Sequence, residues 1–206
     1  MQVVLRTVSS PCLSRQYSKV DPGQACKAVS ELSKAAGKIM MRAQEHKPKY
    51  ATKANERDLI TKWDRAVERM LVSGIRKVFP EHEIISEEGT EGTAKSWVLT
   101  DAPTWIIDPI DGTTNFVHGF PHFCTSIALY VEKKGVLGWI ENPMLRQIYM
   151  TQPGNGAYFN GQRMRVSGQR ELKHSLVYVE CATLGHEAVD FVSLSNIFEL
   201  GTTAHG

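Results

Sequence analysis

The spacing of apolar residues predicts two helices in the first eighty positions. The first begins where Asp21, a helix-capping residue, precedes Pro22. Its apolar residues recur every three or four positions, at Val29, Leu32, Ala36, Ile39 and Ala43. The second helix is expected from near Asp64 to the Phe79–Pro80 pair that ends it. Its apolar face carries Val67, Leu71, Ile75 and Val78.

After Pro80 the pattern changes to short apolar runs that predict β-strands. EIIS and TWIID lead into acidic loops, and CTSIALYV is expected to be a buried strand. VLGWIE, RQIYMTQ and GAYF follow, and the Asn160–Gly161 pair indicates a hairpin. Short turns between successive strands predict an antiparallel sheet with the two helices covering one face. The fold class is therefore α+β.

Composition and charge narrow the class of protein. A formal charge of +2 on 206 residues gives no argument for binding nucleic acid or a membrane surface. No apolar run approaches the roughly 18 residues of a membrane span. The four cysteines lie far apart without a C-x-x-C pair, which indicates a reducing compartment. We therefore expect a cytoplasmic protein that binds neither nucleic acid nor membrane.

The two ends of the chain are predicted to differ from its middle. Residues 1–20 are basic, rich in serine and free of acids, which is the composition of a disordered tail or of an organelle transit peptide. An organellar location therefore stays an alternative. A strand from Ser175 and a helix over 187–200 are expected near the other end. We divide the chain into 1–20, a metal-site domain over 21–170, and the remnant of a second α/β domain over 171–206.

The stretch WIIDPIDGTTNF places two aspartates around a proline at the end of a predicted strand. Pro109 restricts the backbone so that Asp108 and Asp111 point to one side. Gly112 permits a sharp turn, and Thr113 opens a short helix whose N–H groups attract an anion. Carboxylates for hard cations beside amides for phosphate suit phosphoryl transfer. The alternative is structural, with Asp108 forming a turn and Asp111 capping the next helix.

Two further acidic elements extend this constellation. ISEEGTEG supplies Glu87 and Glu88 after a strand, and Asp64 stands at the head of the second helix. A pair of Mg²⁺ ions about 3.5–4 Å apart needs more shared oxygen ligands than one loop provides, and Glu87 would add to them. The structural alternatives are a solvated acidic loop for the two glutamates and an N-cap for Asp64.

Taken together, these elements resemble the inositol monophosphatase family of Mg²⁺-dependent, lithium-sensitive phosphatases. Four stretches carry the resemblance: DLITKWD at 58–64, SEEG at 86–89, WIIDPIDGTTNFVHGFP at 105–121 and GAYFNGQRMRVS at 156–167. The resemblance implies the layered α/β sandwich of the inositol monophosphatase and fructose-bisphosphatase type, an antiparallel sheet flanked by helices. It also implies a homodimer and a small phosphate ester as substrate.

The resemblance implies a Mg²⁺ site and a catalytic role for particular residues. The metal ligands would be Glu87, Asp108, Asp111 and the backbone carbonyl of Ile110. Glu87 would thereby also belong to the catalytic group.

The resemblance further implies how substrate and water are held. Thr113 would position the attacking water, and Asp64 would orient it. The amides of Gly112 and Thr113 would hold phosphate oxygens, with Asp111 and Lys53 beside the substrate. Water activated by the metal would then release phosphate from inositol monophosphate.

The family's pattern includes a later Trp-Asp pair whose aspartate also binds metal. The Trp-Asp pair here is Trp63–Asp64, in a different place. This difference predicts a C-terminally truncated member with incomplete C-terminal layers. Two alternatives to the inositol phosphate enzyme stay open. One is a weakly active shortened form that acts as a metal-binding or dimerising module. The other is a phosphatase for another sugar phosphate or a nucleotide bisphosphate.

Overall fold

The computed structural model of the chain describes residues 20–45, 50–52, 59–89, 93 and 98–176. It divides the chain into one unit over Met1–Met164 and another over Arg165–Gly206. Segment 1–19, Lys53 and the helix expected over 187–200 lie outside the described residues. Within the described part, no helix has both the length and the apolar character to cross a membrane.

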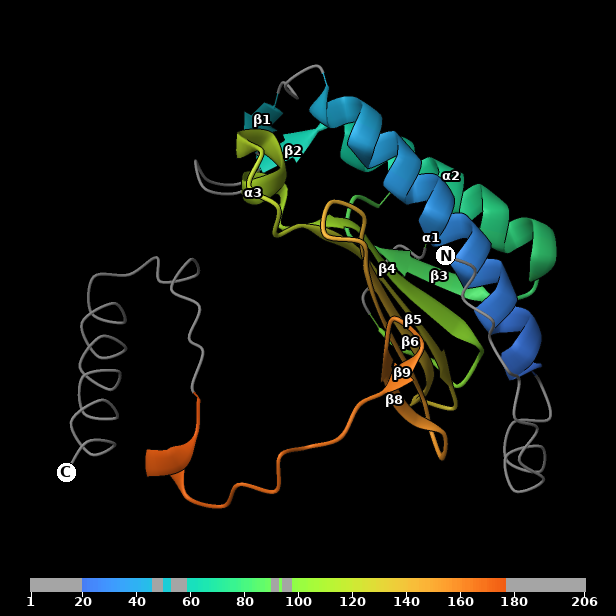
Figure 1. Cartoon of the computed structure of the whole chain (residues 1–206). Helices are drawn as coiled ribbons and strands as arrows, with labels where there is room; N and C mark the ends of the chain where they lie inside the picture. The colour runs from blue at the N-terminus through green and yellow to red at the C-terminus, as the bar shows by residue number, and fades with distance from the viewer. Residues whose placement is uncertain (1–19, 46–49, 53–58, 90–92, 94–97, 177–206) are drawn as a thin grey trace. The chain divides into compact units, whose positions relative to one another are not determined.

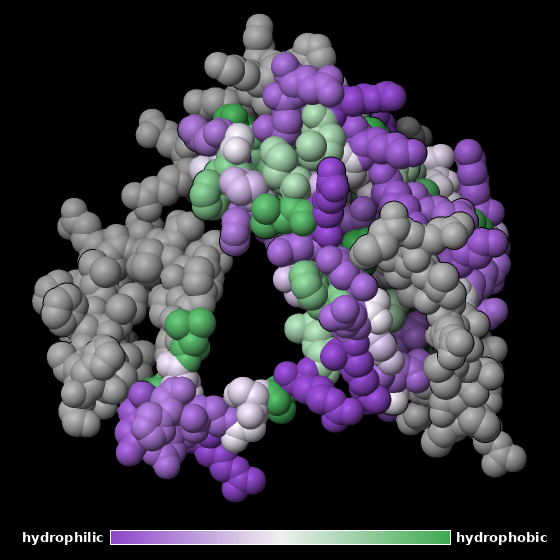
Figure 2. Space-filling model, viewed as in Figure 1, coloured by the Kyte–Doolittle hydropathy of each residue, from purple (hydrophilic) through white to green (hydrophobic). Residues whose placement is uncertain are grey.

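Two long helices of the first unit pack against each other and cover one face of the sheet (Figure 1). Helix α1 (Pro22–Gln44) begins as predicted, because Asp21 Oδ1 accepts the Gly23 N–H at 2.8 Å. Helix α2 (Lys62–Val78) begins earlier than predicted, because Thr61 is its N-cap. The outward surface of the helices is mostly hydrophilic (Figure 2), as expected of amphipathic helices.

The main sheet is seven-stranded, in the order β3-β4-β5-β6-β7-β8-β9. Its strands are β3 (Glu83–Ser86), β4 (Thr104–Asp111), β5 (Cys124–Val131), β6 (Lys134–Asn142), β7 (Gln147–Gln152), β8 (Gly156–Phe159) and β9 (Gln162–Arg163). A separate antiparallel pair joins β1 (Tyr50–Thr52) to β2 (Leu59–Thr61). The α+β class is confirmed, and so is the hairpin at Asn160–Gly161, where both residues have positive φ.

The prediction of an antiparallel sheet is wrong for one strand. Strands β4 to β9 pair antiparallel with their neighbours, but β3 pairs with β4 in parallel. The physical reason is the length of the connection between the two strands. Parallel strands must be joined by a crossover of about a dozen residues or more, and residues 87–103 between β3 and β4 are long enough to provide it.

The core lies between the two helices and the sheet. Its fully buried members include Val29, Ala36, Met40, Val67, Leu71, Ile75, Trp105 and Leu129. The helices approach closely at Gly74, where an added Cβ would lie 2.2 Å from the side chain of Leu32. The predicted apolar faces are confirmed except at Val78, which is 40% exposed because it lies at the last position of α2.

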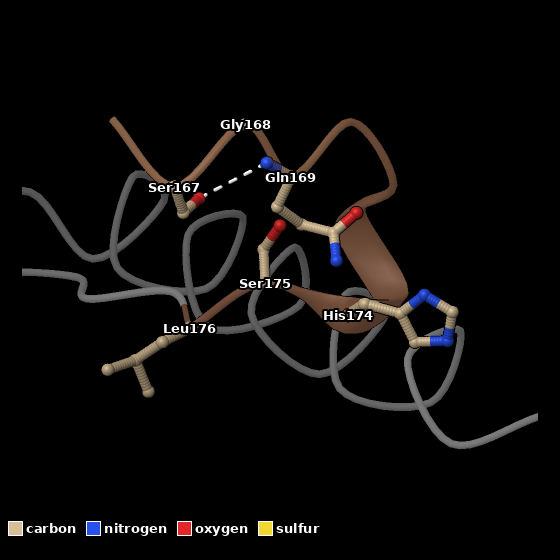
Figure 3. Close-up of a pocket in the computed structure, with 6 residues that line it drawn as sticks. All are labelled: Ser167, Gly168, Gln169, His174, Ser175 and Leu176. Atoms are coloured by element: carbon tan, nitrogen blue, oxygen red, sulfur yellow. Dashed lines mark hydrogen bonds between the residues drawn. The ribbon is translucent and has the colours of Figure 1, made fainter. Parts of the chain in front are cut away.

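The described part of the second unit contains one short helical turn, η1 (Leu172–His174). An open hollow of about 680 Å³ is lined by Ser167, Gly168, Gln169, His174, Ser175 and Leu176 (Figure 3). All of these residues are solvent-exposed, and none of the predicted site residues lines the hollow. Ser175 and Leu176 are not in a strand, and the rest of the strand predicted from Ser175 lies outside the described residues.

Candidate metal centre

The acidic corner of the first unit is built where two neighbouring strands end. Because β3 and β4 are parallel, their carboxyl ends meet at one edge of the sheet. Ser86 is paired with Ile107, and the Glu87 N–H donates to the Ile107 carbonyl at 3.2 Å. Glu87 and Asp108 therefore follow two paired residues and lie side by side. Glu87 is exposed, whereas Asp108 is half-buried.

The pKa of Asp108 is raised by the acidic side chains around it. Burial raises its pKa most, and the charges of Glu87 and Asp111, a hydrogen bond with Glu87 and the charge of Asp64 raise it further, to about 8. Its Oδ1 atom is buried and has no hydrogen-bond partner among the described residues. The Asp108 carboxyl group is therefore influenced electrostatically by acids from three segments: α2, the loop after β3 and the end of β4.

A bulge in β4 separates the two aspartates. Asp108 is paired with Ser126 and Asp111 with Cys124, so the register shifts between them. The buried hydroxyl of Thr125 donates to the Pro109 carbonyl at 3.0 Å, within this bulge. Asp108 and Asp111 lie close enough together for the charge of Asp111 to raise the pKa of Asp108. That Pro109 directs both side chains to one side stays a prediction.

The thiol of Cys124 belongs to the same corner. Its Sγ lies 3.8 Å from Asp111 Oδ2, at hydrogen-bonding distance for sulfur. Burial raises the pKa of Cys124 most, and the charges of Asp111 and Asp108 raise it further, to about 12. The thiol therefore stays protonated, which makes it a weak hydrogen-bond donor and a poor nucleophile.

A tight turn connects Asp111 to helix α3 (Thr113–His118). Gly112 has a φ of +83°, and an added Cβ would lie 2.8 Å from the His122 carbonyl oxygen, so a side chain does not fit. Gly112 is the N-cap of α3, and the alternative in which Asp111 caps this helix is wrong. The Thr113 hydroxyl lies 3.0 Å from the Ile110 carbonyl and 3.2 Å from Asp64 Oδ1.

Asp64 connects this turn to α2. It is buried at the third helical position, and its Oδ2 accepts the Thr61 N–H at 2.7 Å, which completes a capping box. The alternative in which Asp64 itself is the N-cap is therefore wrong. Burial raises the pKa of Asp64 above its ordinary value, while hydrogen bonds from Thr61 and Thr113 act in the opposite direction. Asp64 is thus fixed by α2 and directed toward Thr113.

Glu68 is a residue that sequence reasoning missed. It is fully buried one turn after Asp64, and its Oε2 accepts the Glu88 N–H at 2.9 Å. Its only signal in the sequence is the i, i+4 spacing from Asp64, which places both acids on one helix face.

The donor set of this corner fits a hard cation such as Mg²⁺, because it consists of carboxylate and carbonyl oxygens. The buried oxygen of Asp108 that lacks a partner, next to acids that raise its pKa, is the place where a cation would remove the repulsion. In the described part of the chain, no three His, Cys, Asp or Glu side chains are gathered closely enough to form a ready-made metal site. The ligand set of Glu87, Asp108, Ile110 and Asp111 therefore stays a prediction.

Comparison with known proteins gives one consistent family. Inositol monophosphatase 2 of Solanum lycopersicum is 42% identical over 159 residues, 77% of this chain and 60% of that protein. Inositol monophosphatase 2 of Homo sapiens is 40% identical over 187 residues, 90% of this chain and 65% of that protein. The chain thus spans less than two thirds of the length of these relatives.

Solved structures and the family profile agree with these relatives. The IMPase of Thermotoga maritima matches with a TM-score of 0.60 and 39% identity, over 67% of this chain and 52% of that one. The profile described as the inositol monophosphatase family matches residues 21–204. The chain therefore belongs to the inositol monophosphatase family.

Proposed function

We propose that this chain is a Mg²⁺-dependent phosphomonoesterase that hydrolyses inositol monophosphate to inositol and phosphate. The observation that carries the proposal is the buried Oδ1 of Asp108, which has no hydrogen-bond partner among the described residues and lies beside the acidic groups of Glu87 and Asp111. The relatives that bear the name inositol monophosphatase support the substrate class.

Glu87, Asp108, Asp111 and the Ile110 carbonyl would hold the cation. When bound, Mg²⁺ would lower the pKa of water toward neutrality and neutralise charge that develops on the leaving oxygen. The bulge fixed by Thr125 sets the spacing of the two aspartates, and the Glu87 N–H bond to Ile107 keeps the loop after β3 beside them.

Thr113 and Asp64 would hold the attacking water. The Asp64 carboxylate is fixed by Thr61 and lies 3.2 Å from the Thr113 hydroxyl, so it can orient that hydroxyl and accept its proton in a hydrogen bond. The amides of Gly112 and Thr113 would hold oxygens of the substrate phosphate. Gly112 suits this role, because the turn leaves no space for a side chain and the backbone can approach the ligand closely.

Phosphate release from inositol 1-phosphate by the 206-residue chain, with Mg²⁺ or with EDTA, tests the proposal. We expect release that requires Mg²⁺. Release from another sugar phosphate or a nucleotide bisphosphate, but not from inositol 1-phosphate, would favour the alternative substrate class. Mg²⁺ binding without release from any of these esters would favour the metal-binding module.

The predicted homodimer is a separate question. Sedimentation equilibrium of the full chain decides it, because a mass near twice 23.0 kDa is expected for the dimer and a mass near 23.0 kDa for a monomer. The cytoplasmic location likewise stays a prediction.

A further inference from the structure

Helix α2 buries two carboxylates one turn apart. Asp64 is 1% exposed and Glu68 is 0% exposed, on the same helix face as the apolar side chains of Val67 and Leu71. A buried carboxylate is costly unless hydrogen bonds hold it. The partners of these two acids therefore decide what the acids contribute.

One partner of Glu68 is the backbone of the turn that carries Glu87. Glu68 Oε2 accepts the Glu88 N–H at 2.9 Å. The N–H of Glu87 itself donates to the Ile107 carbonyl at 3.2 Å, so β4 holds the turn on one side of Glu87 and α2 holds it on the other. An N–H bond to a carboxylate is charge-assisted and about twice as strong as a neutral one.

We propose that Glu68 is a positioning residue that directs Glu87 toward the cation beside Asp108. This inference rests on the proposed function and deepens it, because it names the residue that keeps Glu87 at the acidic corner. Glu68 would have the same kind of role as Asp64. Each is a buried acid of α2 that fixes a site element from another segment, Asp64 acting on Thr113 and Glu68 on the 86–89 turn.

The test compares Glu68→Ala with Glu68→Gln in the full chain. The alanine removes the acceptor, whereas the amide oxygen of glutamine keeps one at the same position. Val72→Ala is the matched control, because it removes core packing from the same helix at a residue that is 4% exposed and has no part in the proposed site. Two quantities are measured for each variant: the hydrogen-exchange rate of the Glu88 amide, and the Kd of Mg²⁺ by calorimetry.

For Glu68→Ala we expect the Glu88 amide to exchange about tenfold faster and the Kd of Mg²⁺ to rise by about tenfold or more, the size of effect known for residues that support metal ligands. Glu68→Gln is expected to restore both quantities to within about threefold of wild type. Val72→Ala should lower the unfolding midpoint but leave both quantities near the wild-type values.

An unchanged Kd in Glu68→Ala with a faster Glu88 amide would overturn the inference, because the turn would then have no effect on cation binding. An equal rise of Kd in Val72→Ala would also overturn it, since the effect would follow from stability alone. Wild-type chain that binds Mg²⁺ without releasing phosphate would overturn the proposed function but not this inference, because both readouts are independent of turnover.

Discussion

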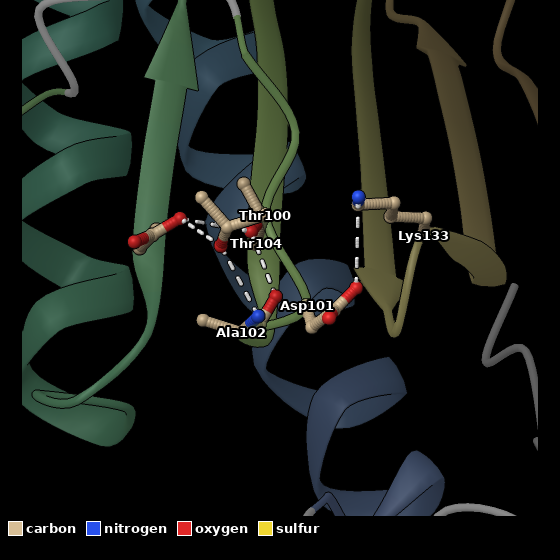
Figure 4. A network of polar contacts seen from close by, with 6 residues as sticks. Thr100, Asp101, Ala102, Thr104 and Lys133 are labelled. Carbon is tan, nitrogen blue, oxygen red and sulfur yellow. Dashed lines mark hydrogen bonds and ion pairs between the residues drawn. The ribbon is translucent and has the colours of Figure 1, made fainter.

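The acidic side chains at the two ends of strand β4 differ in their neighbours. Where β4 begins, the acids have partners of the ordinary kind (Figure 4). Glu83 accepts a hydrogen bond from the Thr100 hydroxyl at 2.7 Å, and the Thr104 hydroxyl lies 3.4 Å from the same oxygen. Asp101 lies 3.8 Å from the ammonium group of Lys133. These contacts connect the start of β3, the segment before β4 and the turn after β5. The acids there already have partners within the protein.

Where β4 ends, the acids face other acids. Asp108 has a buried oxygen without a described partner. Burial raises the pKa of Asp108 most, and Glu87, Asp111 and Asp64 raise it further, to about 8. The comparison teaches that neighbours distinguish a structural acid from a functional one. Partnered acids already have a counter-charge or a hydrogen bond within the protein, whereas mutually repelling acids can be relieved by a cation.

The largest expected effect comes from removing a charge at the acidic end. Asp111→Asn should lower Mg²⁺-dependent phosphate release by at least about 100-fold, because a predicted ligand becomes a poor one. Its unfolding midpoint in EDTA should not fall, since repulsion with Asp108 is lost as well. Asp101→Asn is the same change at the other end of β4, in a side chain that is 78% exposed, and should leave turnover unchanged. Normal turnover in Asp111→Asn would count against the metal role.

The next effect in size concerns the contact between α2 and Thr113. Asp64→Ala should lower turnover roughly 10- to 100-fold, because Thr113 loses the acid that orients it. It should also lower the free energy of unfolding by about 1–2 kcal/mol through loss of the capping box. Asp21→Ala removes a cap from α1 and is the control. If both variants lost stability but neither lost turnover, Asp64 would be only a capping residue.

At the start of β4, the stability contributed by His82 should depend on pH. The Trp105 Nε1–H donates to His82 Nδ1 at 3.0 Å, and burial lowers the pKa of His82. Because the pKa of His82 is lower in the folded state, the unfolded chain binds a proton on this ring more tightly, and protonation therefore favours unfolding. The stability that His82 contributes is therefore present above its ordinary pKa of about 6.5 and is lost as the pH falls below it. Melting curves at several pH values should show a smaller loss for His82→Gln than for wild type between pH 7 and 5. Equal losses would contradict the role of His82.

The smallest effect is expected from the exposed ion pair. Lys133 and Asp101 are 60% and 78% exposed, and such pairs contribute about 0–1 kcal/mol because solvent and salt screen them. Lys133→Ala should therefore change the free energy of urea unfolding by less than about 1 kcal/mol and leave Mg²⁺ affinity unaltered. A large loss would show that this end of β4 carries more of the fold than its contacts suggest.

Local sequence signals predict much of the fold. Asp21 before Pro22 locates the start of α1, because capping depends on neighbouring residues only. The start of α2 was predicted too late, because Thr61 forms its capping box with an aspartate rather than the usual Glu or Gln. The parallel pairing of β3 was missed for a different reason. Pairing depends on contacts between segments, and the residues of EIIS carry no mark of strand direction.

The candidate site could be predicted to a similar extent. Asp108, Asp111 and Gly112 stand within one distinctive stretch, so their proximity follows from chain connectivity. Glu68 could not be found in this way, because its partner is a backbone N–H twenty positions later, and such a contact leaves no trace in residue types. What sequence reasoning loses here is tertiary hydrogen bonding.

The alignment of β3 with β4 has a consequence for how this chemistry can arise or disappear. Side chains alternate between faces along a strand, so sliding β3 by a single position would turn Glu87 to the opposite side and separate it from Asp108. Four paired positions, from Glu83 with Thr104 to Ser86 with Ile107, prevent that slip. Substitutions at the buried apolar positions of this short strand, which bind no cation themselves, can thus decide whether a cation finds its ligands.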